Sequence, residues 1–145
     1  ASATVTASGE SEIVRVESGR PRFGLDMGSE LMPAEAGIVD RAVNFEKGCY
    51  IGQEVVSRME HRGTARSRIL PLTLSGPAPV SSTEIRAGDK LVGTMLSSAG
   101  TRALGLIRLD RLAEAAAPLL TDAVTVRVQK PAWVGYEVPG AEASA

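Results

Sequence analysis

Hydrophobic and polar residues alternate over several short stretches in the second half of the chain. This alternation with a period of two is typical of β-strands that bury one face. Turn-rich connections separate the stretches, including residues 76–89 and a short hairpin-type link at residues 97–100. We therefore predict a small antiparallel β-barrel or sandwich over residues 65–138, in which the expected strands are Leu70–Leu74, Lys90–Leu96, Leu104–Leu109, Val124–Val128 and Trp133–Val138.

The first half of the chain lacks such a set of strands. Ser11–Ser18 predicts a helix, with Ser11 as its N-cap and Gly19 as its stop. Residues 24–37 predict an ordered loop with a helical turn after Pro33. A second short helix or loop is expected at residues 110–120, where Pro118 limits its length.

This distribution predicts an α+β chain in three parts. Residues 1–48 have no strands for a core of their own, so we interpret them as the C-terminal remnant of a preceding domain. Residues 49–140 contain a signature segment and the barrel, and residues 141–145 are expected to form a disordered tail.

Composition restricts the classes of function. The chain has 145 residues with 16 Lys and Arg against 17 Asp and Glu, so its overall charge gives no reason to expect nucleic-acid binding. Its apolar runs are far shorter than the roughly 20 residues that span a membrane, and its first residues do not resemble a secretory signal. We therefore expect no membrane segment and a cytoplasmic location.

The chain contains one cysteine, Cys49, and one histidine, His61. A single cysteine excludes an internal disulfide framework, and zinc or cluster sites within one chain typically use several Cys or His ligands. No metal site within the chain is therefore expected.

The most distinctive local feature is the segment Lys47-Gly48-Cys49-Tyr50-Ile51-Gly52-Gln53-Glu54. Its glycines allow a positive φ or a close approach to a ligand, and Lys47 is expected to favour the thiolate of Cys49. The alternative is that Cys49 is a small buried hydrophobic residue, as most free cysteines are. Gln53 and Glu54 can equally be the first turn of a helix running toward Met59.

This segment matches the signature K-G-C-Y/F-x-G-Q-E of the YgfZ family, relatives of the glycine cleavage T-protein. The stretches RVESGRPRFGLDM and PAEAG also resemble the region shared with T-protein, and the resemblance covers about residues 12–138. It implies the C-terminal part of a YgfZ-like fold, in which a remnant of the central domain precedes the barrel.

The resemblance also implies a function. It indicates a folate-binding accessory protein that supports iron–sulfur cluster assembly or repair and, through it, tRNA modification. Cys49 would be the functional thiol, with Lys47 and Tyr50 shaping its surroundings. Tetrahydrofolate would be the cofactor, and the partners would be iron–sulfur proteins or assembly factors and the N-terminal domain of the parent protein.

Five further positions are expected to lie at the folate site: Arg15, Gly48, Gly52, Gln53 and Glu54. A guanidinium such as that of Arg15 can stack on a planar pterin or pair with a glutamyl carboxylate. The alternative for Arg15 is an ion pair on its own helix with Glu12 or Glu17.

Two other functions remain open. One is a tetrahydrofolate-dependent aminomethyltransferase, although T-proteins usually carry an aspartate or similar residue in place of Cys49 and lack the Gln-Glu pair. The other is a purely structural barrel module. The cluster Arg58, His61, Arg62, Arg66 and Arg68 is interrupted by Glu60 and has no aromatic residue among its members, so direct tRNA contact is not expected.

Overall fold

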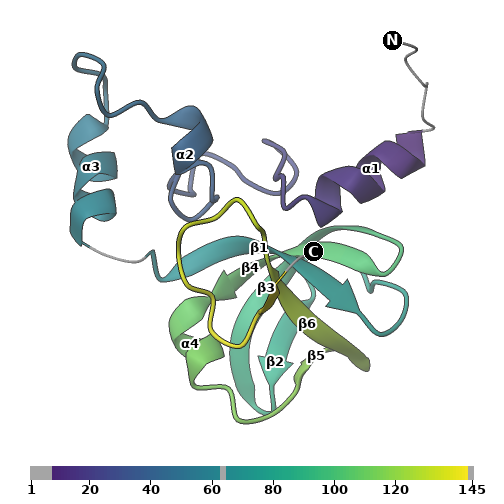
Figure 1. Ribbon diagram of the computed structural model, residues 1–145. Helices are drawn as coiled ribbons and strands as arrows, with labels where there is room; N and C mark the ends of the chain where they lie inside the picture. The colour runs from purple at the N-terminus through teal and green to yellow at the C-terminus, as the bar shows by residue number, and fades with distance from the viewer. Residues whose placement is uncertain (1–7, 63–64, 144–145) are drawn as a thin grey trace.

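Six antiparallel strands form a closed barrel in the computed structural model, which describes residues 8–62 and 65–143 (Figure 1). The order around the barrel is β1-β4-β3-β2-β5-β6, and β6 pairs back with β1. The predicted antiparallel barrel in an α+β chain is therefore confirmed. The six strands are β1 (Ser67–Leu74), β2 (Glu84–Ala87), β3 (Lys90–Ala99), β4 (Arg102–Arg108), β5 (Leu119–Thr121) and β6 (Val124–Lys130).

Two of these strands, β2 and β5, lie where the sequence predicted connections. Both are short, and they pair with each other and with the longer strands β3 and β6. The link between β3 and β4 is also shorter than expected, because the strands run on to Ala99 and Arg102. Only Gly100 and Thr101 remain in the turn, and Gly100 has a φ of 62°, which favours glycine at the first position of a two-residue hairpin loop.

Alternating side chains fill the interior of the barrel. On β1, Leu70, Leu72 and Leu74 point inward and are almost completely buried. Two glycines permit close packing in the barrel: a Cβ at Gly105 would lie 2.6 Å from Leu72 Cδ1, and one at Gly93 would lie 2.5 Å from the backbone oxygen of Leu106. The interior is therefore packed closely enough that these two positions exclude any larger residue.

Helix α1 (Ser8–Glu17) covers the outside of the barrel (Figure 1). Its Val16 is fully buried and packs with Ile69 and Leu104, the outward-facing residues of β1 and β4. Because α1 covers the outer face of β1 and the barrel interior covers the inner one, residues 69–72 are buried without interruption.

The predicted end of α1 at Gly19 is confirmed. Gly19 has a φ of 65°, its N–H donates to Val16 O at 3.1 Å, and the N–H of Arg20 donates to Arg15 O at 3.1 Å. These two bonds form a Schellman motif, in which a residue of positive φ closes the helix. Ser11 is not the N-cap, because the helix already includes Ser8.

Three further helices are short or lie outside the barrel wall. They are α2 (Val39–Ala42), α3 (Gln53–Arg62) and α4 (Leu109–Ala113). Figure 1 shows α3 standing to one side of the barrel, separate from α1. No helix in the described residues is long and apolar enough to cross a membrane.

The C-terminal segment differs from the prediction. Trp133–Val138 forms turns rather than a strand: Val134 N donates to Pro131 O at 3.2 Å, and the side chains of Val134 and Val138 are buried without strand pairing. The chain then forms β7 (Glu142–Ala143), parallel to β6, in the segment predicted to be a disordered tail. Residues 144–145 of that segment lie outside the described residues.

The close approach at Gly93 generates a prediction. We expect Gly93→Ala to lower the free energy of unfolding by about 1–3 kcal/mol, because the new methyl would collide with backbone that cannot move without opening the β3–β4 pairing. Urea unfolding of the chain measures this. Gly135→Ala is the control, because no atom lies within 4 Å of its added Cβ. Equal stability of the two variants would contradict the packing described for the barrel.

Candidate functional site

The guanidinium of Arg15 lies at a junction between α1, the segment after it and β3. Its Nε and Nη2 donate to the two carboxylate oxygens of Glu12, at 3.0 and 2.5 Å. Its Nη1 donates to Asp26 Oδ2 at 2.7 Å and to the backbone oxygen of Arg20 at 2.6 Å, and Nη2 also donates to Ser97 Oγ at 2.7 Å. All five N–H groups of the guanidinium are therefore used within the chain.

Asp26 is the buried partner in this network. Its side chain is 0% exposed, whereas that of Arg15 is 14% exposed. Besides Arg15, its carboxylate accepts the backbone N–H groups of Arg22 at 2.9 Å and Ser97 at 3.0 Å. A buried carboxylate is stable only when it is paired and hydrogen-bonded in this way.

The contact with Ser97 depends on an irregularity in β3. The pairing of β3 with β4 shifts by one residue between Met95 and Ser98, which is the signature of a β-bulge. A bulge leaves a backbone N–H outside the ladder, and Asp26 accepts that of Ser97. The bulge thereby attaches the loop after α1 to the barrel.

These contacts bear directly on the expected role of Arg15. Hydrogen bonding to Glu12 is the main cause that raises the pKa of Arg15, and the same bond lowers the pKa of Glu12. The ion pair with Glu12 matches the alternative that the sequence left open for Arg15. A folate contact by this guanidinium stays a prediction, and it would require Arg15 to exchange one of its present partners for the ligand.

The signature segment forms an exposed loop that leads into α3. Asn44 orders its beginning, because Asn44 Oδ1 accepts the backbone N–H groups of Glu46 at 2.9 Å and Lys47 at 3.2 Å. Gly48, Cys49 and Ile51 are exposed. The structure therefore excludes the alternative in which Cys49 is a buried hydrophobic residue.

Lys47 and Tyr50 interact next to the thiol. The ammonium of Lys47 lies over the ring of Tyr50, 5.0 Å from its centroid, which is a cation–π contact. The Tyr50 hydroxyl oxygen is buried and has no hydrogen-bond partner among the described residues. Leaving a buried hydroxyl unpaired in this way is costly.

The end of the segment forms the first turn of α3. Gly52 has a φ of 86°, which confirms the need for a glycine there, and its carbonyl accepts the N–H groups of Val55 and Val56 at 3.1 Å. Gln53 and Glu54 begin the helix, as the alternative for this pair predicted, and Glu54 forms an ion pair with Arg58. A role of these residues in folate binding stays a prediction.

The basic cluster is dispersed among structural contacts. Arg58 pairs with Glu54, and Arg68 stacks on Tyr136 at 4.0 Å and donates to the backbone oxygen of Ala34. The side chains of His61 and Arg62 lie outside the described residues. Among the described residues no group of three or more Cys, His, Asp or Glu side chains is arranged to hold a metal ion.

Arg15 therefore lies in a network on α1 and β3, whereas the other predicted site residues lie in the loop before α3 and its first turn. Asp26 and Ser97 are the network residues that the sequence analysis did not single out. Asp26 lies within the stretch that resembles T-protein, so a signal for it was present. Ser97 was assigned to a hairpin link, because the bulge cannot be seen in the local pattern.

Comparison with known proteins gives a consistent result. Residues 66–136 match the family model described as the CAF17 C-terminal β-barrel domain. The chain is 32% identical over 106 residues to the mitochondrial iron–sulfur cluster assembly factor IBA57 of Mus musculus, covering 68% of this chain and 30% of the relative. It is 36% identical over 95 residues to the homologue from Neosartorya fischeri, covering 66% of this chain and 19% of that relative.

A solved structure has a similar fold. The crystal structure of glycine cleavage system aminomethyltransferase T from Bartonella henselae superposes with a TM-score of 0.66 and 15% identity, covering 88% of this chain and 38% of that protein. At this identity the likeness concerns the fold alone. The chain spans less than a third of the length of the two curated relatives above.

The buried pair of Arg15 and Asp26 yields a prediction on stability. We expect Arg15→Ala to lower the free energy of unfolding by about 3 kcal/mol, because Asp26 would remain buried without its countercharge. Chemical denaturation at neutral pH measures the effect. Lys90→Ala, which removes an exposed pair with Glu114, is the matched control and should change stability little. A small effect of both variants would mean that the network does not attach the loop to the barrel.

Proposed function

We propose, on the premise that residues 66–136 belong to the CAF17 C-terminal β-barrel family, that this chain is the C-terminal part of an iron–sulfur cluster assembly factor that acts through the thiol of Cys49. The names of the relatives from Mus musculus and Neosartorya fischeri support the assignment to cluster assembly. The observation that carries the role of Cys49 is the exposure of this thiol in the loop between α2 and α3.

The number of thiols limits how the chain can handle a cluster. Iron–sulfur clusters are held by several thiolates, typically four, and this chain has only Cys49. The chain can therefore supply one thiolate at most, and the remaining ligands must come from elsewhere in the parent protein or from a partner protein. An exposed position is what such shared ligation requires, because the partner's ligands have to approach the same iron atoms.

Lys47 and Tyr50 fit the role of groups that surround this thiol. The contact of the Lys47 ammonium with the Tyr50 ring keeps a positive charge within the loop that carries Cys49.

Folate binding is proposed for the parent protein, with this chain forming one wall of the site. The resemblance to T-protein supports a tetrahydrofolate pocket shared between domains, and Gly48, Gly52, Gln53 and Glu54 lie on the loop and helix that would face it. Arg15 would act there by holding the segment after α1 in place. The effect on tRNA modification would then be indirect, through an iron–sulfur enzyme.

A functional thiol predicts a clear phenotype. In a deletion strain that expresses the full-length parent protein, we expect Cys49→Ala and Cys49→Ser to lose most iron–sulfur enzyme activity, because neither side chain provides a thiolate. The measurement is the specific activity of an iron–sulfur enzyme, normalised to the amount of parent protein. Glu46→Ala changes an exposed residue of the same loop and should retain activity. Full activity of Cys49→Ala would exclude the thiol from the function and favour a structural module.

A shared folate pocket predicts a difference between the parent and this chain. We expect calorimetric titration under reducing conditions to detect tetrahydrofolate binding to the parent, and much weaker binding to the 145-residue chain, because the other walls are missing from it. Arg15→Lys in the parent tests the positioning role: affinity should fall while the fold is retained. Absence of binding to both proteins would contradict a folate site and leave the thiol-dependent function unaffected.

A further inference from the structure

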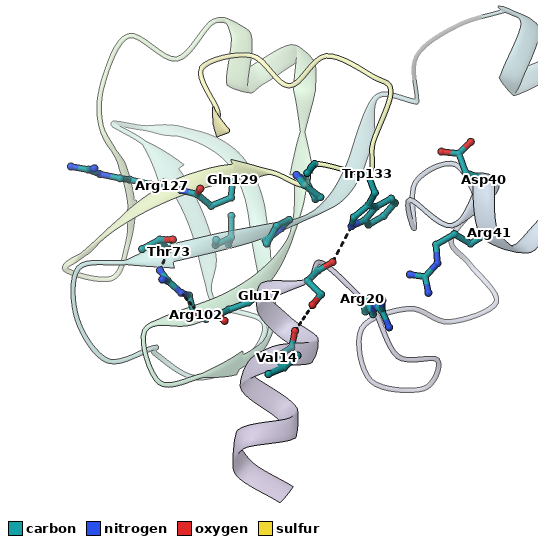
Figure 2. A pocket seen from close by; sticks show the side chains of 15 residues that line it. Val14, Glu17, Arg20, Asp40, Arg41, Thr73, Arg102, Arg127, Gln129 and Trp133 are labelled. Atoms are coloured by element: carbon teal, nitrogen blue, oxygen red, sulfur yellow. Dashed lines mark hydrogen bonds and ion pairs between the residues drawn. The ribbon is translucent and has the colours of Figure 1, made fainter. Parts of the chain in front are cut away.

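A groove of ≈ 940 Å³ lies on the outside of the barrel, between the end of α1, strands β1 and β6, and the segment that follows β6 (Figure 2). None of its lining residues belongs to the signature loop. Four of them are arginines from four different segments: Arg20, Arg41, Arg102 and Arg127. The groove therefore gathers positive charge that the sequence distributes over more than one hundred residues.

One end of the groove is a row of side chains across three neighbouring strands. Thr73 on β1 is paired with Arg102 on β4 and with Arg127 on β6, so Thr73 lies between these two residues across the sheet. Arg102 donates to Thr73 Oγ1 at 2.8 Å and to Glu17 at 2.8 Å. Its Nη2 atom has no hydrogen-bond acceptor among the described residues. This end is therefore partly neutralised and still offers donors.

The other end is formed by Arg20, Arg41 and Trp133, as Figure 2 shows. Trp133 is 39% exposed, and its indole N–H donates to the backbone oxygen of Ser18 at 3.2 Å, which fixes the ring. The guanidinium of Arg41 lies 5.8 Å from the ring centroid. No hydrogen-bond acceptor or ion-pair partner within the described residues contacts the guanidinium of Arg20 or that of Arg41.

The lining contains fewer carboxylates than guanidinium groups. The two carboxylates in the lining are Glu17, which is engaged by Arg102, and Asp40 on α2. Bringing guanidinium groups together beside an indole raises the electrostatic energy unless an anion lies among them. Guanidinium groups bind phosphate and carboxylate through paired N–H donors, and an indole face covers the apolar part of a ligand.

We propose that this groove binds a small polyanion, a molecule that carries phosphate or several carboxylate groups, with its charged group between Arg20 and Arg41 and its body against Trp133. The volume lies within the range of about 300–1,000 Å³ that small-molecule sites occupy. The near-neutral net charge of the chain, -1, argues against a long nucleic acid as the occupant. This site goes beyond the proposed function, because its lining includes neither Cys49 nor Gly48, Gly52, Gln53 or Glu54.

The single tryptophan of the chain makes the proposal directly measurable. Because Trp133 is the only source of indole fluorescence and Arg41 lies over its ring, an anion that draws this guanidinium away changes the emission. The probes are pyrophosphate and citrate, titrated into the 145-residue chain at constant ionic strength. A saturable change with either probe is the expected result, and the stronger of the two identifies phosphate or carboxylate as the preferred group.

Substitutions locate the binding. We expect Arg20→Gln and Arg41→Gln each to weaken binding by about tenfold, and the double variant to abolish it, because each removes a charge-assisted contact. Arg108→Gln changes an exposed arginine on β4 that pairs with Asp110 outside the groove, and it should leave affinity unchanged. Calorimetry on Trp133→Phe checks that the signal reports binding rather than quenching alone. No saturation with either probe, or equal affinity in the double variant, would overturn the proposal.

Discussion

The buried contact between the guanidinium of Arg15 and the carboxylate of Asp26 joins the N-terminal segments to the barrel. Asp26 is fully buried and accepts hydrogen bonds from α1, from its own loop and from the bulge of β3. Removing a charged group from water is costly, so this carboxylate is stable only in the arrangement that supplies all of its donors. The direction of α1 and the path of the segment after it both follow from that requirement.

The barrel provides the rigid frame on which this junction rests. Its closure by β6 and β1 buries Leu70, Leu72 and Leu74, while Val16 of α1 covers the outer face of the same strand. The signature loop, in contrast, exposes Cys49. The packed core and the exposed thiol thus lie in different parts of the chain. An exposed thiol fits the contact with a partner that we propose for Cys49.

The barrel also positions positively charged side chains in the groove beside Trp133. Cross-strand pairing places Arg102 and Arg127 on either side of Thr73, and the Schellman motif at Gly19 directs the chain so that Arg20 lines the opposite end. Arg41 reaches the groove from α2. The net charge of the chain is near zero, but the fold brings several arginines together at this groove.

Local signals in the sequence determined three features of the fold. Alternation of apolar and polar residues predicted the longer strands, the glycine cap predicted the helix end at Gly19, and the glycine of positive φ at Gly52 preceded the exposed first turn of α3. These signals act between near neighbours in the chain, so the sequence alone contains them. The short strands β2 and β5 were missed because their pairing partners, rather than their own residues, decide their conformation. The predicted strand at Trp133–Val138 was wrong. Val134 and Val138 are buried, and their spacing along the sequence resembles the alternation of a strand. The sequence offered Glu12 as a partner of Arg15, but tertiary structure alone decided the distant partners: Ser97 lies 82 residues away, and only the bulge in β3 turns its N–H toward Asp26.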